Sequence, residues 1–498
     1  MISERKINIA TLLFFIAFFA IGVFTFRDYG ISFDEGFQRM MGFVNYNYIT
    51  TGDASVLNGK FEKFYGPAYE IILYASEKLF KVTDSRTIFL LRHFISFLTF
   101  FTATIFFYFL SLKIFKKNYI ALLSCIFLVL SPRIFAEAFY NSKDLSMLCF
   151  TIIACYTMYV FVERQTNLMA IVHAAMCGFV IDIRITGILL PMITIYFLIF
   201  QKKNKIIPIL SFIIYLIFFI IIFWPFLWQN PFHNFIEAFR QMSKFPWRGT
   251  VLYFGKYSSA RELPWHYLFV WIGISTPILY IILFFAGLFY ILKKTFSNFY
   301  SSVNFHPVLM LAILPLIAIL ILGSCVYNSW RHVFFIYPFI LLTAIYGLIE
   351  IKSSLNFKIA QNILKLLIVS SLGYTLFFMI YYHPYNNVYF NLLAGKNVKQ
   401  NFELDYWGLS YKKGLEYILE HDKSNKIYVY DGRIGLVSLN RNIINSEDRK
   451  RLFYTDEINE ANYFLIDIRW YPLEYTKGSL FYKIDVDNEN ILEVRKLK

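Results

Sequence analysis

The sequence predicts a helical membrane protein that crosses the bilayer many times and ends in a small α/β domain. Of its 498 residues, 58% are hydrophobic and 20% are aromatic, while only 16% are charged. A soluble core of this size does not need so much apolar content. Long apolar runs follow one another up to residue 381, whereas the composition from residue 383 onwards is that of a soluble domain. We therefore expect an all-α polytopic membrane protein with an α/β carboxyl-terminal region.

The formal net charge of +15 does not indicate nucleic-acid binding. The basic residues form short clusters between apolar runs instead of one stripe, which is typical of positive-inside topology. The five cysteines lie in or beside apolar segments and lack metal-type spacing, so neither disulfides nor a cysteine metal site is expected. The membrane is therefore a partner, and nucleic acid is not.

The first apolar run, 7–26, has the roughly 20 residues that a membrane span requires. It is longer than a signal-peptide core and lacks a small-x-small cleavage site, so we interpret it as a retained span. The basic start, 1–6, places the amino terminus in the cytoplasm. Residues 27–84 then form an outside segment with interfacial helices, for which 66–80 is the best candidate.

Ten further spans follow, with lysine and arginine clusters at their inner ends. The hairpin 168–200 is expected to break at Asp182 and Arg184 on the outer face, since a central charge costs roughly 2.5–3.5 kcal/mol even on a mild insertion scale. A second long outside loop covers 224–266. The ten spans are expected at 87–112, 119–130, 145–162, two within 168–200, 206–223, 267–292, 308–322, 333–348 and 359–381.

An odd number of crossings that begins inside ends outside, so the last region is extracytoplasmic. We expect two domains: 1–382 in the membrane, with outside loops 27–84 and 224–266, and 383–498 outside it. Residues 409–420 have helical spacing. Strand-like runs lie at 426–430, 463–468, 480–486 and 491–494.

Under this topology, all the polar clusters face the outside. The cytoplasmic loops are short and rich in lysine, and the chain has no Walker-type glycine loop for a nucleotide. The clusters are Asp34 and Glu35; Glu62 and Lys63; Arg133; Asn141, Lys143 and Asp144; Asp182 and Arg184; Arg248, Arg261 and His266; and Arg331 and His332. Their common side predicts an active site at the outer membrane surface.

Asp34 and Glu35 allow two interpretations. A charged pair can simply mark the end of a span. Alternatively, repulsion between carboxylates near a low-dielectric surface raises the pKa of one of them, which suits a general base. Glu62 and Lys63 similarly form either an ordinary surface ion pair or, through Lys63, a point charge for a phosphate.

The sequence from Asn141 to Asp144 precedes a span and reads well as a helix start, because Asn caps a helix and Asp favours its first turn. A helix start beside Lys143 and Arg133 also suits an anion. Placing the Arg184 guanidinium at membrane depth costs free energy, so its presence there indicates a phosphate-binding role more specifically.

His266 and His332 also allow two interpretations. A histidine at an aromatic interface commonly serves as an amphipathic anchor, and it is also a common metal ligand. The sequence does not assign a metal site, although it leaves a divalent metal ion open.

These motifs together resemble the bacterial branch of glycosyltransferase family 39, which includes protein O-mannosyltransferases and the aminoarabinose transferases of lipid A. The resemblance extends over nearly the whole chain. It rests on Asp34-Glu35, Phe61-Glu62-Lys63, Ser131-Pro132-Arg133, Tyr140-Asn141-Ser142-Lys143-Asp144, Leu263-Pro264-Trp265-His266, Trp330-Arg331-His332 and Phe402-Glu403-Leu404-Asp405-Tyr406-Trp407-Gly408.

The resemblance implies a GT-C fold and an inverting transfer of sugar from a polyprenyl-phosphate donor. It implies that Asp34 is the catalytic base with Glu35 as its neighbour, that Glu62 and Lys63 lie beside the lipid phosphate, and that Arg184 also lies near it. No cofactor is required in such a reaction, and a divalent metal ion is optional.

Combined with the charge clusters, the resemblance predicts a donor-phosphate set of Lys63, Arg184, Arg133 and Lys143. Further site candidates are Glu62, Asn141, Asp144, His266, Arg331 and His332. The acceptor is a lipid, a glycan or a protein, and the expected location is the bacterial cytoplasmic membrane.

Two other classes of function stay open. A transporter or flippase of lipid-linked sugar would need ionisable groups near the bilayer midplane and often shows internal pseudo-symmetry. A non-enzymatic assembly factor would leave the placement of Asp34, Glu35 and Arg184 unexplained.

Overall fold

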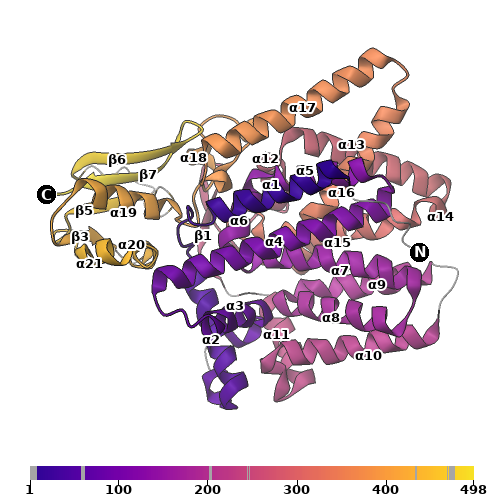
Figure 1. The fold of residues 1–498 in the computed structure, drawn as a ribbon, viewed down its shortest axis with the longest axis horizontal. Helices are drawn as coiled ribbons and strands as arrows, with labels where there is room; N and C mark the ends of the chain where they lie inside the picture. Colours follow the sequence, from indigo (N-terminus) through magenta and orange to yellow (C-terminus); the bar gives the residue numbers. More distant parts are fainter. Residues whose placement is uncertain are drawn as a thin grey trace.

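The computed structural model describes residues 8–57, 62–200, 205–243, 245, 247–431, 434–467, 469 and 477–498. The predicted basic start 1–6, together with Phe61, Lys202 and Lys203, lies outside these residues, as does the side chain of Glu62. Figure 1 shows a helical bundle with a small sheet domain at one end.

The bundle contains every segment that the sequence predicts as a span. Its helices are α1 (Ile9–Thr25), α4 (Ser85–Phe115), α5 (Asn118–Val129), α6 (Pro132–Tyr140), α7 (Asp144–Arg164), α8 (Asn167–Ile183), α9 (Leu189–Ile199), α10 (Ile206–Phe223), α12 (Tyr267–Ser275), α13 (Ile278–Ser297), α14 (Phe299–Ser302), α15 (His306–Leu322), α16 (Tyr337–Ser354) and α17 (Lys358–Tyr381). Short 3₁₀ turns connect them at η3 (Ile185–Ile188), η5 (Val303–Phe305) and η6 (Arg331–Ile336).

Among the described residues, seven helices are long and apolar enough to cross a membrane, or eight if α5 and α6 form one broken span. Three shorter apolar stretches are α1, α8 and the run of η3 and α9. The chain is therefore a multi-pass membrane protein, while the count of eleven crossings stays a prediction.

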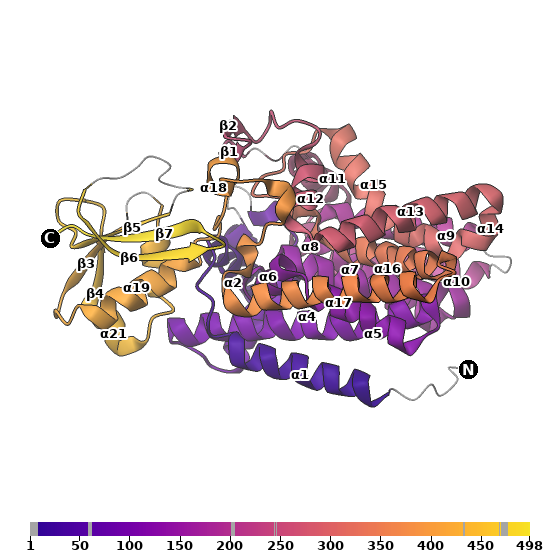
Figure 2. The same ribbon diagram turned by 90° about the horizontal axis from the view of Figure 1, so that it is seen from above.

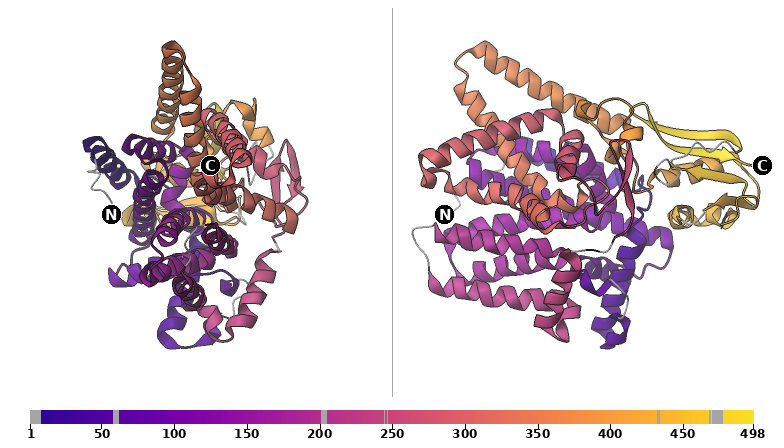
Figure 3. Two further views of the ribbon diagram at one scale, coloured as in Figure 1. Left: turned by 90° about the vertical axis from the view of Figure 1, so that its right-hand side faces the viewer. Right: turned by 180° about the vertical axis from the view of Figure 1, so that it is seen from behind.

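Burial separates the centre of the bundle from its periphery. The apolar windows of α7 and α16 are 78% and 89% buried, compared with 11% and 17% for α10 and α17. Figures 2 and 3 show α1 and α17 at the outside of the bundle. A helix that exposes apolar side chains on most sides is stable only in lipid, so α10 and α17 face the bilayer.

Two predicted segments differ from the structure. Residues 131–144, which lie between the predicted spans 119–130 and 145–162, include the wholly buried helix α6, which bends by 70° from α5. The predicted span 267–292 is two helices separated by Thr276 and Pro277, because proline lacks the N–H that a helix interior needs. The predicted break near Asp182 and Arg184 is confirmed, since α8 ends at Ile183.

Both segments that the sequence predicts to lie outside contain short helices. The first contains α2 (Glu35–Thr51), η1 (Ala54–Leu57), η2 (Glu62–Phe64) and α3 (Ala68–Leu79). The second contains η4 (Pro225–Trp228), α11 (Pro231–Ser243) and an antiparallel hairpin of β1 (Thr250–Tyr253) and β2 (Lys256–Ser259). The predicted helix at 66–80 is thereby confirmed as α3.

After α17, the chain first packs against the bundle through η7 (Asn386–Val388), η8 (Leu392–Ala394) and α18 (Val398–Asn401). A five-stranded sheet follows, in the order β4-β3-β5-β7-β6. Its strands are β3 (Ile427–Tyr430), β4 (Leu452–Thr455), β5 (Tyr463–Ile466), β6 (Ser479–Val486) and β7 (Glu489–Lys496), and its helices are α19 (Ser410–His421), α20 (Leu436–Arg441) and α21 (Ser446–Arg451). The small α/β domain is thus present.

Candidate functional site

A cavity of about 400 Å³ lies where the bundle meets the sheet domain. Its lining comes from segments that are far apart in the chain. The polar and charged members are Asp34, Gln38, Tyr65, Lys143, Arg184, Tyr327, Asn328, Arg331, His332, Tyr406 and Arg469. Among the described residues that line the cavity, Asp34 supplies the only carboxylate.

Asp34 stands at the start of α2, on a turn that neighbouring residues hold. The backbone N–H of Ser32 donates to the Glu35 carboxylate at 2.6 Å, which closes the turn much as a capping box does. The Asp34 side chain makes no cap hydrogen bond and is 34% exposed. Its carboxylate is therefore presented to the cavity instead of to its own helix.

Four charged side chains form a row of alternating sign. Nη1 of Arg331 lies 2.8 Å from Oδ2 of Asp34 and 3.2 Å from Oδ2 of Asp144. Arg184 donates to the other oxygen of Asp144, which is fully buried. A buried carboxylate needs such partners to be tolerated, so Asp144 fixes both guanidinium groups at the cavity.

Asn141 supports this row from behind. Its Oδ1 accepts from the backbone N–H of Asp144 at 2.8 Å, and its Nδ2 donates to Oδ2 of Asp144 at 3.2 Å. Asn141 thus satisfies the first backbone N–H of α7, at the helix start that the sequence predicts, and the same contacts hold Asp144 in the row of charges.

The cavity is rich in positive charge. Lys143, Arg184, Arg331 and Arg469 line it. The Lys143 ammonium lies 3.0 Å from the centre of the Tyr65 ring, and burial, followed by repulsion from Arg184, lowers the pKa of Lys143 well below that of an ordinary lysine. Cations gathered in a partly closed space favour an anionic ligand.

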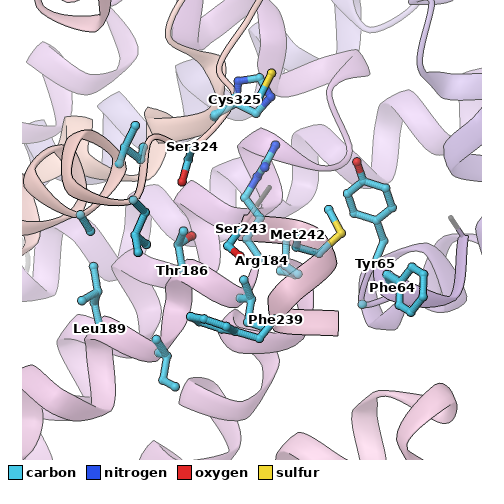
Figure 4. A pocket seen from close by; sticks show the side chains of 18 of the residues that line it. Phe64, Tyr65, Arg184, Thr186, Leu189, Phe239, Met242, Ser243, Ser324 and Cys325 are labelled. Atoms are coloured by element: carbon cyan, nitrogen blue, oxygen red, sulfur yellow. The ribbon is translucent and has the colours of Figure 1, made fainter. Parts of the chain in front are cut away.

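An apolar cavity of about 210 Å³ adjoins the charged one. The two share Tyr65, Arg184, Met242, Cys325 and His332, and Figure 4 shows four of these residues labelled around the apolar space. Its walls come from η3, α9, α11 and α15 and include Phe64, Leu189, Phe239, Ile319 and Leu322. An apolar slot therefore opens onto cations at Arg184.

His332 lies at the junction of both cavities. It packs edge to face on Tyr327, with ring centres 4.6 Å apart, and its Nδ1 is buried without a hydrogen-bond partner among the described residues. Within that part of the chain, no group of three or more His, Cys, Asp or Glu side chains is placed to hold a metal ion.

Some predicted site residues lie elsewhere. Glu35 is buried, and its carboxylate is 2.8 Å from Nε2 of His93. Arg133 lies over the rings of Trp271 and Phe390. The structure therefore does not bring Glu35 or Arg133 into either cavity, because each is enclosed in the protein interior.

His266 and Lys63 also lie outside the lining. Nδ1 of His266 is 2.7 Å from the Tyr253 hydroxyl. The Lys63 ammonium packs against the rings of Phe64 and Phe226, at 5.1 and 5.4 Å from their centres. Because Phe64 lines the apolar cavity, Lys63 is at its edge, whereas His266 lies at the start of α12.

Several aromatic and basic residues that complete the charged cavity have no role predicted from the sequence. Trp247 stacks on Tyr327 at 4.0 Å between ring centres, and Trp407 lies against the Arg331 guanidinium at 4.8 Å. Tyr406 and Trp407 lie in a motif that the sequence singled out, but no spacing pattern marks Trp247 or Arg469 as site residues.

Comparison with known proteins agrees with this architecture. Residues 66–228, about a third of the chain, match the family model described as dolichyl-phosphate-mannose-protein mannosyltransferase. The oligosaccharyltransferase of Archaeoglobus fulgidus superimposes with a TM-score of 0.51 and 10% identity over 93% of this chain and 70% of that one. The chain therefore has the GT-C fold.

Two further comparisons concern structures with bound lipid phosphates. The archaeal oligosaccharyltransferase AglB in complex with an inhibitory peptide and a dolichol-phosphate gives the same TM-score, identity and coverage. ArnT from Cupriavidus metallidurans, bound to undecaprenyl phosphate, gives a TM-score of 0.48 at 13% identity over 97% of this chain and 98% of that chain. A search of curated proteins finds no match.

Proposed function

We propose that this chain is a glycosyltransferase that moves a sugar from a polyprenyl-phosphate donor to an extracytoplasmic acceptor, with inversion at the anomeric carbon and Asp34 as the general base. The observation that carries the proposal is the junction at Arg184, where an apolar slot opens onto a cationic cavity that holds one accessible carboxylate. A lipid-linked phosphate has the matching chemistry, since its tail is apolar and its head is anionic. The AglB structure with a dolichol-phosphate supports the same donor class.

In this proposal, the donor phosphate lies among Arg184, Lys143 and Arg331. These cations stabilise the negative charge that grows on the phosphate as the bond between the anomeric carbon and the phosphate oxygen breaks. The polyprenyl phosphate leaves with both electrons of that bond. Lys63, at the edge of the apolar cavity, is a further contact for the lipid phosphate.

Asp34 acts on the other side of the sugar. Its carboxylate takes the proton from the acceptor hydroxyl as that oxygen bonds to the anomeric carbon. Attack opposite the leaving phosphate inverts the anomeric centre. Arg331 orients the carboxylate through the 2.8 Å contact, and Asp144 holds Arg331 in place from its buried side.

A metal ion does not fit between the two carboxylates. The position that a bridging cation would take between Asp34 and Asp144 is filled by the Arg331 guanidinium, within 3.2 Å of both. In the proposed reaction, Arg331 supplies the positive charge between these two carboxylates.

The proposed location is the bacterial cytoplasmic membrane, with the active site outside. The charged cavity and the sheet domain lie at one end of the bundle. At the other end, lysines follow α4 and precede α10, among them Lys116 and Lys205 (Figure 1). Positively charged helix ends favour the cytoplasmic side, so the sheet domain and the acceptor are outside.

The test is turnover of a panel of polyprenyl-phosphate sugars by detergent-purified protein, measured as release of free polyprenyl phosphate. Asp34→Asn is expected to abolish release while donor binding and the melting temperature stay unchanged. Asp28→Asn is the matched control, because the Asp28 carboxylate is exposed and pairs with His383 outside the cavity.

Equal release by wild type and Asp34→Asn would remove Asp34 as the base. Transport of an unaltered lipid-linked sugar across a vesicle, without release of polyprenyl phosphate from any donor, would instead indicate a flippase.

A further inference from the structure

The segment that carries Asp34 is held by residues near the other end of the chain. Oδ1 of Asn440 accepts from the backbone N–H of Ile31 at 2.9 Å, and its Nδ2 donates to the Ile31 carbonyl at 3.2 Å. These are the two bonds that a neighbouring β-strand would make. Asn440 is fully buried, so water does not replace it in this arrangement.

Two further contacts continue the same attachment on either side of Ile31. The backbone N–H of Phe33 donates to the carbonyl of Trp407 at 3.0 Å. The ammonium of Lys412 on α19 donates to the carbonyls of Arg27 and Asp28, at 2.5 and 3.1 Å. The backbone of residues 27–33 is therefore hydrogen-bonded to the carboxyl-terminal region at several points along its length.

The approach at Gly30 leaves no room for a side chain. A Cβ at this position would lie 2.5 Å from the Leu409 carbonyl oxygen and 2.7 Å from Oδ1 of Asn440. Glycine is used where two backbones must approach this closely. The sequence of the segment is thus fitted to the sheet domain and not only to the end of α1.

Asp34 depends on this attachment together with the Ser32–Glu35 turn and Arg331. Its side chain makes no helix-cap bond, and in the described part of the chain its side-chain hydrogen bond is to Arg331. Its position relative to the donor phosphate is therefore set by the backbone that precedes it.

We propose that Asn440 is a positioning residue for Asp34, so that the carboxyl-terminal domain is part of the catalytic machinery and not only a cap that covers it. This inference rests on the proposed role of Asp34 as the base. It adds a positioning role to a domain that already lines the cavity through Tyr406, Trp407 and Arg469.

The test compares Asn440→Ala with Asn442→Ala. Among the described residues, the Asn442 side chain donates to the carbonyls of Ser438 and Leu439, about one helical turn before it, so its loss leaves residues 27–34 untouched. Asn440→Ala is expected to lower kcat on the order of tenfold to a hundredfold, as a misplacement of about 1 Å does. Donor affinity is expected to stay at the wild-type value, because the basic residues of the cavity are unchanged.

Hydrogen–deuterium exchange gives a readout that does not need turnover. Peptides covering 27–34 are expected to exchange faster in Asn440→Ala than in the wild type or in Asn442→Ala. Gly30→Ala is the second variant, since it displaces the same segment and leaves the sheet domain intact. It is expected to give the same loss of kcat with unchanged donor affinity.

Wild-type kcat in a folded Asn440→Ala, or in a folded Gly30→Ala, would overturn the positioning role. A loss of donor affinity equal to the loss of kcat would also overturn it, because that result indicates a general collapse of the site. If the wild type itself releases no polyprenyl phosphate, the proposed function fails. The attachment is tested separately: unchanged hydrogen–deuterium exchange at 27–34 in Asn440→Ala would show that Asn440 does not hold this segment.

Discussion

One guanidinium nitrogen of Arg331 lies within 3.2 Å of two carboxylates, one open to the cavity and one fully buried. Removing one partner from a buried charge cluster leaves the others unpaired, which costs about 3–5 kcal/mol. Arg331 is thus part of the proposed site, and it also stabilises the folded protein. Its aromatic neighbours, Trp407 and Tyr327, hold the planar group in position.

We expect sugar transfer to continue in the presence of EDTA, because Arg331 provides the cation between Asp34 and Asp144. The measurement is release of polyprenyl phosphate before and after chelation, with Asp34→Asn as the inactive comparison. Loss of wild-type transfer on chelation, with recovery on adding Mn²⁺, would contradict this.

Because Lys143 is buried, we expect donor affinity to depend on pH. The phosphate binds the charged ammonium, and burial lowers the pKa of Lys143 below the ordinary 10.5. Affinity is therefore expected to fall as pH rises through that lowered pKa, at a lower pH than an exposed lysine would produce. Lys143→Arg is expected to remove the fall, because arginine does not lose its proton in this range.

The measurement is the Kd of polyprenyl phosphate across the alkaline range. Lys413→Arg is the control, since Lys413 is an exposed residue of α19. A profile in Lys143→Arg that matches the wild type would exclude Lys143 as the titrating group.

At the scale of the elements, the close contact of α13 and α16 determines how the centre of the bundle packs. A Cβ at Gly287 would lie 1.9 Å from the Thr343 carbonyl oxygen, and one at Gly347 would lie 2.3 Å from that of Leu283. Small residues let helix backbones approach closely where lipid offers no hydrophobic driving force. The two glycines are therefore a matched pair at one crossing.

Gly287→Ala is expected to lower stability by about 1–3 kcal/mol, because the added methyl overpacks this contact. Gly373→Ala on α17 is the control, since no atom lies within 4 Å of its Cβ position. Thermal unfolding in one detergent checks both. An unchanged melting temperature for Gly287→Ala would mean that the two helices separate without cost.

At the scale of the whole molecule, the sheet domain is tied to the bundle a second time at the start of α4. Arg449 on α21 donates to Asp84 at 2.7 Å and also to Ser85. The carbonyl of Ile443 accepts from Nε of Arg86 at 3.1 Å. Together with Asn440, these contacts attach the domain to both ends of the first outside segment.

A double-mutant cycle of Asp84→Ala and Arg449→Ala is expected to give a coupling of about 0.5–1 kcal/mol, as for a partly exposed ion pair. The hydrogen bond to Arg449 lowers the pKa of Asp84 below 3.8. The stabilisation is therefore present at neutral pH and is lost as pH falls through the lowered pKa. A coupling of zero in thermal unfolding would show that this pair does not contribute to docking.

The sequence by itself determined where the chain enters lipid. Apolar helices of this length are required by the thickness of the bilayer and by the absence of water in it, so each predicted span coincides with helical structure, although 267–292 is divided into two helices. The break after α8 was also predicted, because placing the charged Arg184 at the centre of a span costs free energy. The sequence also identified Asp34, Lys143, Asp144, Arg331 and His332 as polar residues at helix ends.

Only the tertiary structure decided which of these residues meet. Glu35 and Asp34 are neighbours in sequence, yet one pairs with buried His93 and the other faces the cavity. Arg133 is enclosed by aromatic rings, and Asn440 reaches Ile31 across 409 residues. These outcomes depend on how far each helix is rotated and tilted against its neighbours, which packing fixes and local sequence patterns do not encode.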